Sequence, residues 1–182
     1  MYIQEIQLSE IKDLNPKGVF SSFEWLSIYS KKDIQILGLF NKNKELIGCF
    51  YYQKHKRAGV FSHIAPPFLS PNCGLYIEDE SSNPAKKNSF VKKVHELISD
   101  YFKNEKFDIL SVPFPECFSD MQPYLWGRFE VTPKYTYQIN LSRSEEELLG
   151  SMSPERRKNI TKSIKDGLIV NESIGCTHSQ EL

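Results

Sequence analysis

The pattern of apolar and polar residues predicts a β-sheet in the first half of the chain. Residues 2–8 alternate like a short opening strand, whereas 34–40 and 46–53 are strongly apolar runs on either side of the turn cluster Asn41–Lys44. Apolar runs of this length, bounded by turn residues, are typical of an antiparallel hairpin. The same pattern then predicts a second turn and a short strand, over 55–59 and 60–64.

Other segments repeat their apolar residues at helical spacing. The clearest helix is predicted over 84–103, opened by Asn83-Pro84, because its apolar residues recur on one face. These residues are Phe90, Val91, Val94, Leu97, Ile98, Tyr101 and Phe102. His95 lies beside this stripe and is expected at the surface or at the boundary of the core. Shorter helices are predicted from Ser22 to about Lys31 and from Cys117 to Trp126.

A continuous apolar run at 107–112 predicts a buried central strand, and residues 129–131 and 135–141 are predicted to complete the sheet. The expected fold class is therefore α/β (α+β), with a mixed, mostly antiparallel sheet and helices on both faces. In this arrangement the hairpin of residues 33–54 lies beside the central strand, and the 84–103 helix packs on the sheet.

The stretch after residue 141 carries a series of helix-boundary signals. Ser142 and Glu145 have the spacing of a capping box, which predicts a helix start. Ser153 is a second N-cap candidate, Pro154 follows it at the first helical position, and Gly167 offers a stop at the C′ position. The predicted order is strand, short helix, basic helix, glycine stop and a further strand.

This order resembles the Fem-type (FemAB-like) peptidoglycan interpeptide-bridge transferases and, more broadly, the GNAT-superfamily acyltransferases. In that family a helix with an Arg-x-Asn-Ile pattern ends in a Gly-Val-type step. The matching positions in this chain are Arg157, Asn159, Ile160, Gly167 and Leu168. The resemblance covers nearly all of the chain but about half of the family's architecture, which has two GNAT-like domains.

The resemblance implies a division of the chain at residue 141. Residues 1–141 would form a GNAT-like N-terminal domain, and residues 142–182 would hold connecting helices and the start of a second, truncated GNAT-like domain, with a strand over 168–172. We therefore expect a missing C-terminal domain. Because of the surface that it would cover, the isolated chain is expected to form a homodimer or to adopt a shifted C-terminal helix.

Composition limits the classes of partner. Lys+Arg and Asp+Glu both count 23, so the net charge gives no strong nucleic-acid or membrane signal. No apolar run approaches the ~20 residues of a transmembrane segment, and residues 1–14 lack the apolar core of a secretory signal. The four cysteines and four histidines show no metal-ligand spacing, so we expect no metal and a reducing, cytoplasmic setting.

Four candidate substrate-binding residues come from the first 80 residues. Arg57 and His63 flank the 60–64 strand and can meet a phosphate or carboxylate, although both also fit exposed turn residues. Tyr76 follows a proline-rich loop and either orients a substrate or packs the loop down. Trp25 resembles a helix aromatic found early in the family, and burial in the core explains it equally well.

Arg157 is the strongest single candidate, because its planar guanidinium group suits a diphosphate and it lies in the segment that carries the resemblance. An ion pair with the acidic cluster Glu145–Glu147 is the competing interpretation. No residue is assigned a catalytic role.

The expected function is the acceptor-side domain of an acyl- or aminoacyltransferase acting on an amine, for which a cell-wall precursor is a candidate. The Arg/Gln-x-x-Gly-x-Gly/Ala loop that holds acyl-CoA in GNAT enzymes is absent, since all nine glycines are isolated. The resemblance places donor chemistry, with acyl-CoA or aminoacyl-tRNA, in the second domain, so this chain alone should be inactive and without a cofactor. The alternatives are a non-catalytic module that binds a ligand or partner through a degenerate acyltransferase fold, and a structural half that packs against the catalytic domain.

Overall fold

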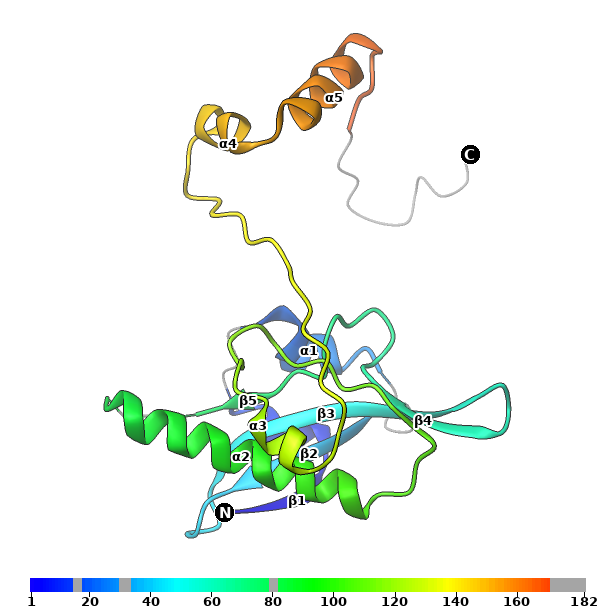
Figure 1. Cartoon of the computed structure of the whole chain (residues 1–182), viewed down its shortest axis with the longest axis vertical. Coiled ribbons are helices and arrows are strands. Elements are labelled where there is room, and N and C mark those ends of the chain that lie inside the picture. Colours follow the sequence, from blue (N-terminus) through cyan, green and yellow to red (C-terminus); the bar gives the residue numbers. More distant parts are fainter. Residues whose placement is uncertain (15–17, 30–33, 79–81, 171–182) are drawn as a thin grey trace. The chain divides into compact units, whose positions relative to one another are not determined.

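The computed structural model describes residues 1–14, 18–29, 34–78 and 82–170, apart from the side chain of Arg57. The chain divides into two units, residues 1–133 and 134–182, which are described separately. The first unit contains the sheet (Figure 1). Its strands are β1 (Tyr2–Ile6), β2 (Gln35–Phe40), β3 (Leu46–Arg57), β4 (Phe61–Ala65), β5 (Tyr76–Ile77) and β6 (Ile109–Leu110).

The sheet is mixed and mostly antiparallel, in the order β1-β2-β3-β4-β6, with β5 paired to β3. Only β4 and β6 run parallel among the described strands. The predicted hairpin is confirmed as β2 and β3, and Asn41 closes its turn by accepting from the amides of Asn43 and Glu45 at 2.8 and 3.1 Å. The second turn is shorter than predicted, because β3 continues to Arg57 and only residues 58–60 turn.

Helices of the first unit are mostly short. They are the 3-10 helices η1 (Leu8–Ile11) and η2 (Val19–Ser21) and the α-helices α1 (Phe23–Leu26), α2 (Pro84–Asn104) and α3 (Gln122–Trp126). Asn83 caps α2 by accepting from the amides of Ala85 and Lys86, and Pro84 occupies the first turn, as predicted. Ser22 caps α1 as expected, but the helix ends at Leu26 instead of near Lys31.

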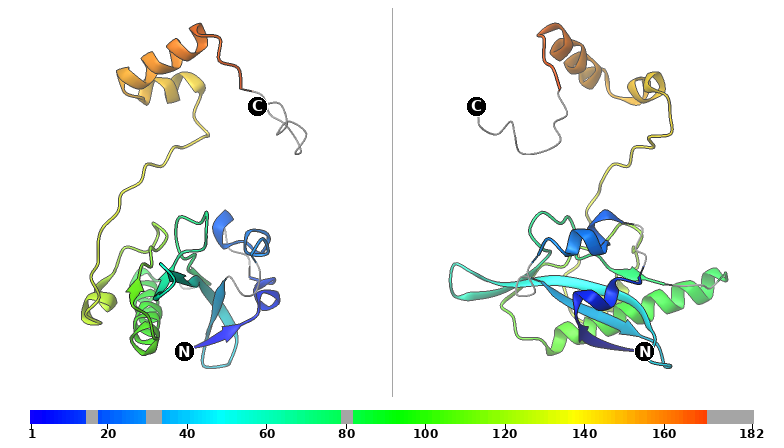
Figure 2. Two further views of the ribbon diagram at one scale, coloured as in Figure 1. Left: turned by 90° about the vertical axis from the view of Figure 1, so that its right-hand side faces the viewer. Right: turned by 180° about the vertical axis from the view of Figure 1, so that it is seen from behind.

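Strand β3 separates two apolar cores because successive side chains of a strand point to opposite faces. The first core lies between the sheet and α2, and the second lies under η1 and α1; Figure 2 shows these helices on opposite sides of the sheet. Phe50 and Tyr52 face the first core, whereas Cys49 and Tyr51 face the second. An α+β fold with helices on both faces of the sheet is thereby confirmed.

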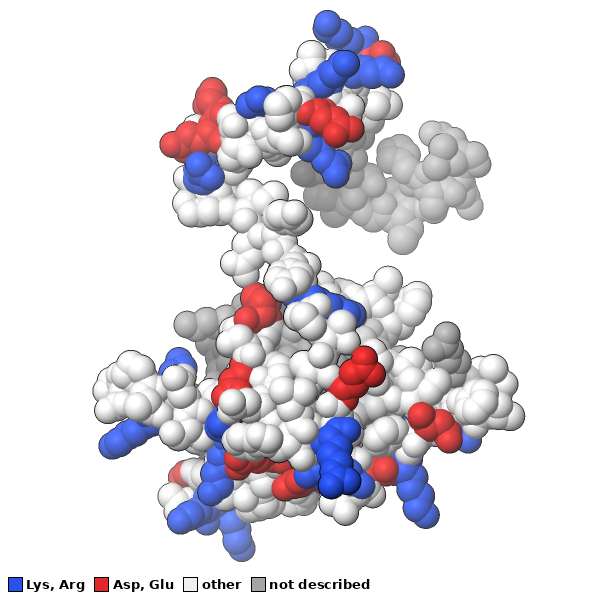
Figure 3. Space-filling view, viewed as in Figure 1, with Lys and Arg blue, Asp and Glu red and all other residues white. Residues whose placement is uncertain are grey.

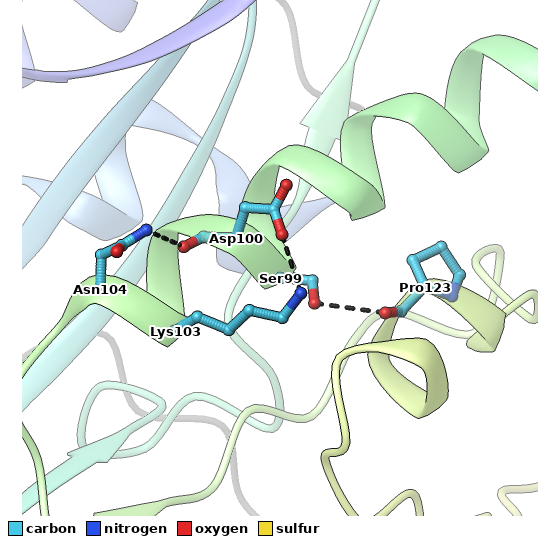
Figure 4. Close-up of polar contacts among 5 residues, drawn as sticks. All are labelled: Ser99, Asp100, Lys103, Asn104 and Pro123. Carbon is cyan, nitrogen blue, oxygen red and sulfur yellow. Dashed lines mark hydrogen bonds and ion pairs between the residues drawn. The ribbon is translucent and has the colours of Figure 1, made fainter.

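The C-terminal half of α2 makes polar contacts with α3 and within itself. Ser99 donates from Oγ to the carbonyl of Pro123 at 3.2 Å (Figure 4). One turn further along α2, Lys103 pairs with Asp100 at 2.9 Å, and Asn104 donates to the Asp100 carbonyl at 2.8 Å. Helix α3 begins at Gln122 and not at Cys117 as predicted, and the Ser99 bond joins its first turn to α2.

Two predictions about this side of the sheet are wrong. The run 107–112 forms only the two-residue strand β6, which lies at the edge of the sheet and pairs with β4. Its remaining apolar residues, with Phe114 beyond them, pack against the first core without strand pairing. His95 is fully buried instead of lying at the boundary, because Phe114, Phe118 and Tyr124 surround its ring.

The second unit contains α4 (Glu145–Ser151) and α5 (Pro154–Lys165). The cap of α4 is Ser144, which exchanges hydrogen bonds with Glu147, so the predicted box of Ser142 and Glu145 is displaced by two residues. Both pairs have the required spacing, but Ser142 instead donates to Asn140 Oδ1 at 2.8 Å.

The boundaries of α5 follow the prediction. Ser153 caps its first turn and Pro154 begins it. At the other end, Gly167 has φ +74° and donates to the Ile164 carbonyl, while the amide of Leu168 reaches the carbonyl of Ser163. These two bonds are the Schellman pattern, which a left-handed glycine allows.

The strands predicted at 129–131 and 135–141 do not form, and neither does the beginning of the one predicted at 168–172, where residues 168–170 are irregular. Tyr135 and Tyr137 are 94% and 99% exposed, so the alternating pattern of this stretch has no sheet beneath it. Residues 171–182 lie outside the described part of the chain.

Candidate functional site

The candidate site lies at the carboxyl ends of the parallel strands β4 and β6, where two connecting segments leave the sheet together. In open sheets the crevice outside the carboxyl ends of parallel strands is the common place for a ligand. After β4 comes the proline loop, which we define as residues 66–74. The Cys73 amide of this loop donates to the carbonyl of Pro113, in the segment after β6, at 2.9 Å.

Two aromatic side chains from α1 and the turn after it hold the proline loop. The indole Nε1 of Trp25 donates to Ser70 Oγ at 2.9 Å. The hydroxyl of Tyr29 donates to the carbonyl of Phe68 at 2.5 Å and lies 3.4 Å from Ser70 Oγ. Ser70 is buried, so water does not compete freely for these bonds. The proline loop is therefore attached to α1 and to the turn after it.

The backbone of the proline loop is also fixed from within. The amide of Ser70 donates to the carbonyl of Pro67 at 2.9 Å, which places Leu69 in a left-handed conformation with φ +65°. Asn72 accepts from the amide of Gly74 at 2.9 Å. Phe68 and Leu69 remain 75% and 73% exposed. The loop thus presents two apolar side chains from a rigid backbone.

Trp25 and Tyr76, both candidates from the sequence, pack against the second core. Trp25 does more than fill this core, because its indole nitrogen binds the loop. Tyr76 lies opposite Cys49 in the β3–β5 pairing, and its hydroxyl donates to Glu78 Oε1 at 3.4 Å. Burial, and then the charge of Glu78, raise the pKa of Tyr76, so its hydroxyl stays protonated at neutral pH.

His63 lies inside β4, directly opposite His55 on β3, with the two ring centroids 4.9 Å apart. It is half-buried, so the interpretation as an exposed turn residue is wrong for His63. Its strand leads into the proline loop. Arg57 ends β3 and pairs with Phe61, and its side chain lies outside the described structure.

Arg157 belongs to the second unit. Its Nη1 donates to the carbonyl of Gly150 at 3.2 Å, which joins α5 to the end of α4. Among the described residues, Arg157 forms no ion pair with the cluster Glu145–Glu147. Acidic residues gather on α4 and basic residues along α5 (Figure 3). The competing ion-pair interpretation is therefore not what the structure shows.

Sequence reasoning missed Tyr29 and Ser70, which complete the contact between α1 and the loop. Two signals were present: Tyr29 follows Trp25 at a spacing of four residues, and Ser70 is the hydroxyl residue between the loop's prolines. A spacing of four puts two side chains on one side of a helical turn. Neither signal identifies the hydrogen-bond partner of these side chains, because Trp25 and Ser70 are 45 positions apart and Tyr29 and Phe68 are 39 positions apart.

The thiols near this site are not nucleophiles. Burial raises the pKa of Cys49 to about 12 and raises the pKa of Cys73 as well, so both remain protonated. No group of three or more metal-ligating side chains occurs in the described part of the chain. The site therefore offers hydroxyl and indole groups and apolar surface.

A separate hollow of about 330 Å³ lies between β1 and α2. Its two carboxylates are already engaged, since Glu105 pairs with Lys54 and Asp100 with Lys103. Paired carboxylates have little attraction left for a cationic ligand. This hollow is therefore a weaker candidate than the proline loop.

Searches against protein-family models, curated proteins and solved structures find no match. In addition, none of the helices that the structure describes is long and apolar enough to cross a bilayer.

Proposed function

We propose that this chain is the acceptor-side domain of a GNAT-like, FemAB-like acyltransferase that moves an acyl or aminoacyl group onto an amine. A peptidoglycan precursor of the cell wall is the candidate acceptor. The observation that carries the proposal is the proline loop, held rigidly by Trp25 and Tyr29 at the carboxyl ends of the parallel strands.

The order of elements supports the proposal. One strand, short helices and four antiparallel strands are followed by the long helix α2 and by β6, which runs parallel to β4. This is the βαββ…αβ order that the GNAT resemblance implies. The support is at the level of fold, and fold alone does not determine function.

The role of an acceptor-side domain is to position an amine, because proximity and orientation lower the barrier to attack on a bound ester or thioester. Phe68 and Leu69 offer apolar contacts to the body of the acceptor. In this proposal His63 and Arg57 are candidates to contact its phosphate or carboxylate groups. Arg157, in the second unit, is a separate candidate for binding a diphosphate. Tyr76 and Trp25 support the loop.

The donor, acyl-CoA or aminoacyl-tRNA, would be held by a second domain of the complete enzyme. None of the nine isolated glycines forms a phosphate-binding loop motif, so this chain alone should bind acetyl-CoA weakly. Isothermal titration measures this directly. Saturable binding at ~1 μM corresponds to about −8 kcal/mol and needs a formed pocket, so it would contradict the acceptor-side assignment.

The proposal is tested by NMR titration with a soluble uridine-diphosphate-linked precursor whose peptide carries a free amine. We expect shifts in the amides of residues 66–76 and in the indole resonance of Trp25. The Phe68→Asp variant should lose these shifts, whereas Val19→Asp, which changes another exposed apolar residue, should retain them. An unchanged spectrum at millimolar precursor would reject this loop as an acceptor site.

The alternative is a non-catalytic module that binds a ligand or partner. It is favoured by the indole of Trp25 and the hydroxyls of Tyr29 and Ser70, which contact one another at the loop and include no acid–base pair. A transfer assay on the full gene product, supplied with both donors and the precursor, separates the two. Product formation supports the enzyme, and binding without transfer supports the module.

A further inference from the structure

The β3–β4 hairpin carries an exposed apolar tip. Val60 and Phe61 are 64% and 51% exposed at the turn where β3 ends and β4 begins. The hairpin projects beyond the rest of the first unit (Figure 1). Its turn is tight, since Ala58 and Gly59 both have positive φ values, of +51° and +76°. The tip is therefore a rigid projection with apolar residues at its end.

A basic stretch of β3 leads into this tip. The sequence from 54 to 57 is Lys-His-Lys-Arg, and no Asp or Glu occurs from residue 46 to residue 77. The ammonium group of Lys56 lies beside the tip, 3.4 Å from the carbonyl of Val60. His55 is exposed on the opposite face of the strand, since successive residues alternate. An ammonium group thus lies directly behind the apolar end, within a segment that is rich in basic residues.

Two nearby carboxylates already have hydrogen-bond partners. Glu105 pairs with Lys54 at 3.0 Å, and Asp108 accepts from the backbone amide of Ser62 at 2.7 Å. Lys56 has no carboxylate within ion-pair distance among the described residues. The ammonium group beside Val60 is therefore free to meet an external anion.

We infer that the β3–β4 hairpin docks on an anionic lipid surface, with Val60 and Phe61 entering the boundary between headgroups and acyl chains. Exposed apolar side chains next to basic side chains favour binding to such a surface, because the apolar groups enter the interface while the cations attract the anionic headgroups. Each Lys or Arg near an anionic bilayer strengthens binding by about fivefold. A nucleic acid would use the cations equally well, but it offers no apolar phase for Val60. The combination of the two features therefore favours lipid.

The test is co-sedimentation of the 182-residue chain with phosphatidylcholine vesicles, with and without phosphatidylglycerol. We expect binding to the anionic vesicles that is at least ten times stronger and that weakens with salt. Phe61→Ser should reduce it roughly tenfold, and Lys56→Gln about fivefold. Val19→Ser, which removes another exposed apolar residue outside the hairpin, is the matched control and should bind as the parent chain does.

Circular dichroism of each variant verifies that the fold is intact. Equal binding to neutral and anionic vesicles would overturn the inference, and so would unchanged binding by folded Phe61→Ser. Capture of single-stranded RNA that depends on Lys56, together with no vesicle binding, would assign the hairpin to nucleic acid instead. These outcomes do not depend on whether the precursor binds the proline loop.

Discussion

The imidazole of His95 is fully buried, with its Nδ1 lying 2.9 Å from the hydroxyl of Tyr124. The hydrogen bond joins α2 to α3 inside a cage of aromatic rings. The other ring nitrogen, Nε2, is buried without a hydrogen-bond partner in the described structure. A neutral imidazole tolerates this environment, whereas an imidazolium would have no counter-charge in contact with it.

We predict that this burial makes the fold sensitive to mild acid. Burial lowers the pKa of His95 from its usual 6.5 to about 4, although the charge of Asp120 opposes the shift. Above pH 6.5 the residue is neutral in both states and adds no pH dependence. Between pH 6.5 and 4 only the unfolded chain gains the proton. The free energy of unfolding therefore decreases as the pH is lowered through this range, by about 3 kcal/mol in total.

The measurement is urea unfolding at several pH values between 7.5 and 5, for the parent chain and for His95→Phe. The variant loses the titrating group, so its free energy of unfolding should decline less over this interval. Parallel profiles for the two proteins would mean that His95 is accessible to protons in the native state.

A second prediction concerns Gly74, which has φ +44° and lies against the ring of Tyr51. A Cβ atom there would come within 1.8 Å of that ring, so Gly74→Ala should cost about 3 kcal/mol or more, from both overpacking and backbone strain. Gly59→Ala is the control, because Gly59 has φ +76° with nothing within 4 Å. It should cost only about 1 kcal/mol. Similar losses in thermal unfolding would show that the ring of Tyr51 moves aside.

The contact between Trp25 and Ser70 gives a third prediction. In a double-mutant cycle with Trp25→Phe and Ser70→Ala, the coupling energy should be about 1 kcal/mol, as for a shielded hydrogen bond between neutral groups. Amide exchange reports the loop directly: the Ser70 amide should exchange faster in either variant, while amides in the middle of α2 stay protected. If the effects of the two single substitutions on the free energy of unfolding simply add, the loop is held by its backbone alone.

The fourth prediction concerns the exposed face of α5. Ile164 is 70% exposed, and a second copy of the chain would cover it. We expect the chain to form a concentration-dependent dimer in sedimentation, and Ile164→Asp to shift it to monomer. Asn159→Asp adds the same charge on the other side of the helix, five residues away, and should leave the dimer intact. A monomeric parent chain at every concentration would contradict this prediction.

The sequence predicted elements whose signals are local. The β2–β3 hairpin and α2 carry their own turn and cap residues, Asn41 and Asn83, so their existence did not depend on distant contacts. The start of α4 was ambiguous for a local reason, since two serine–glutamate pairs with equal spacing overlap.

Other features depend on what packs against them. The run 107–112 has the composition of a central strand, but only tertiary contacts decide that most of it covers a core without pairing. His95 could not be assigned from its helix alone, because the rings that bury it come from residues 114–124. The site has the same limitation: Trp25 was selected from the sequence, whereas its partner Ser70 lies 45 residues away.

Burial of β3 on both faces has a consequence for how the sheet finds its alignment. When one face of a strand is polar, a slip by one residue exposes apolar side chains and is rejected. In β3 such a slip would exchange aromatic residues between two apolar cores. Burial alone therefore distinguishes the native register poorly from the slipped one. The hydroxyl groups supply the missing information: Tyr51 reaches the carbonyl of Phe20, and Tyr52 reaches Tyr101 on α2. Two oxygen atoms at the ends of neighbouring rings thus distinguish the native alignment from its nearest competitor.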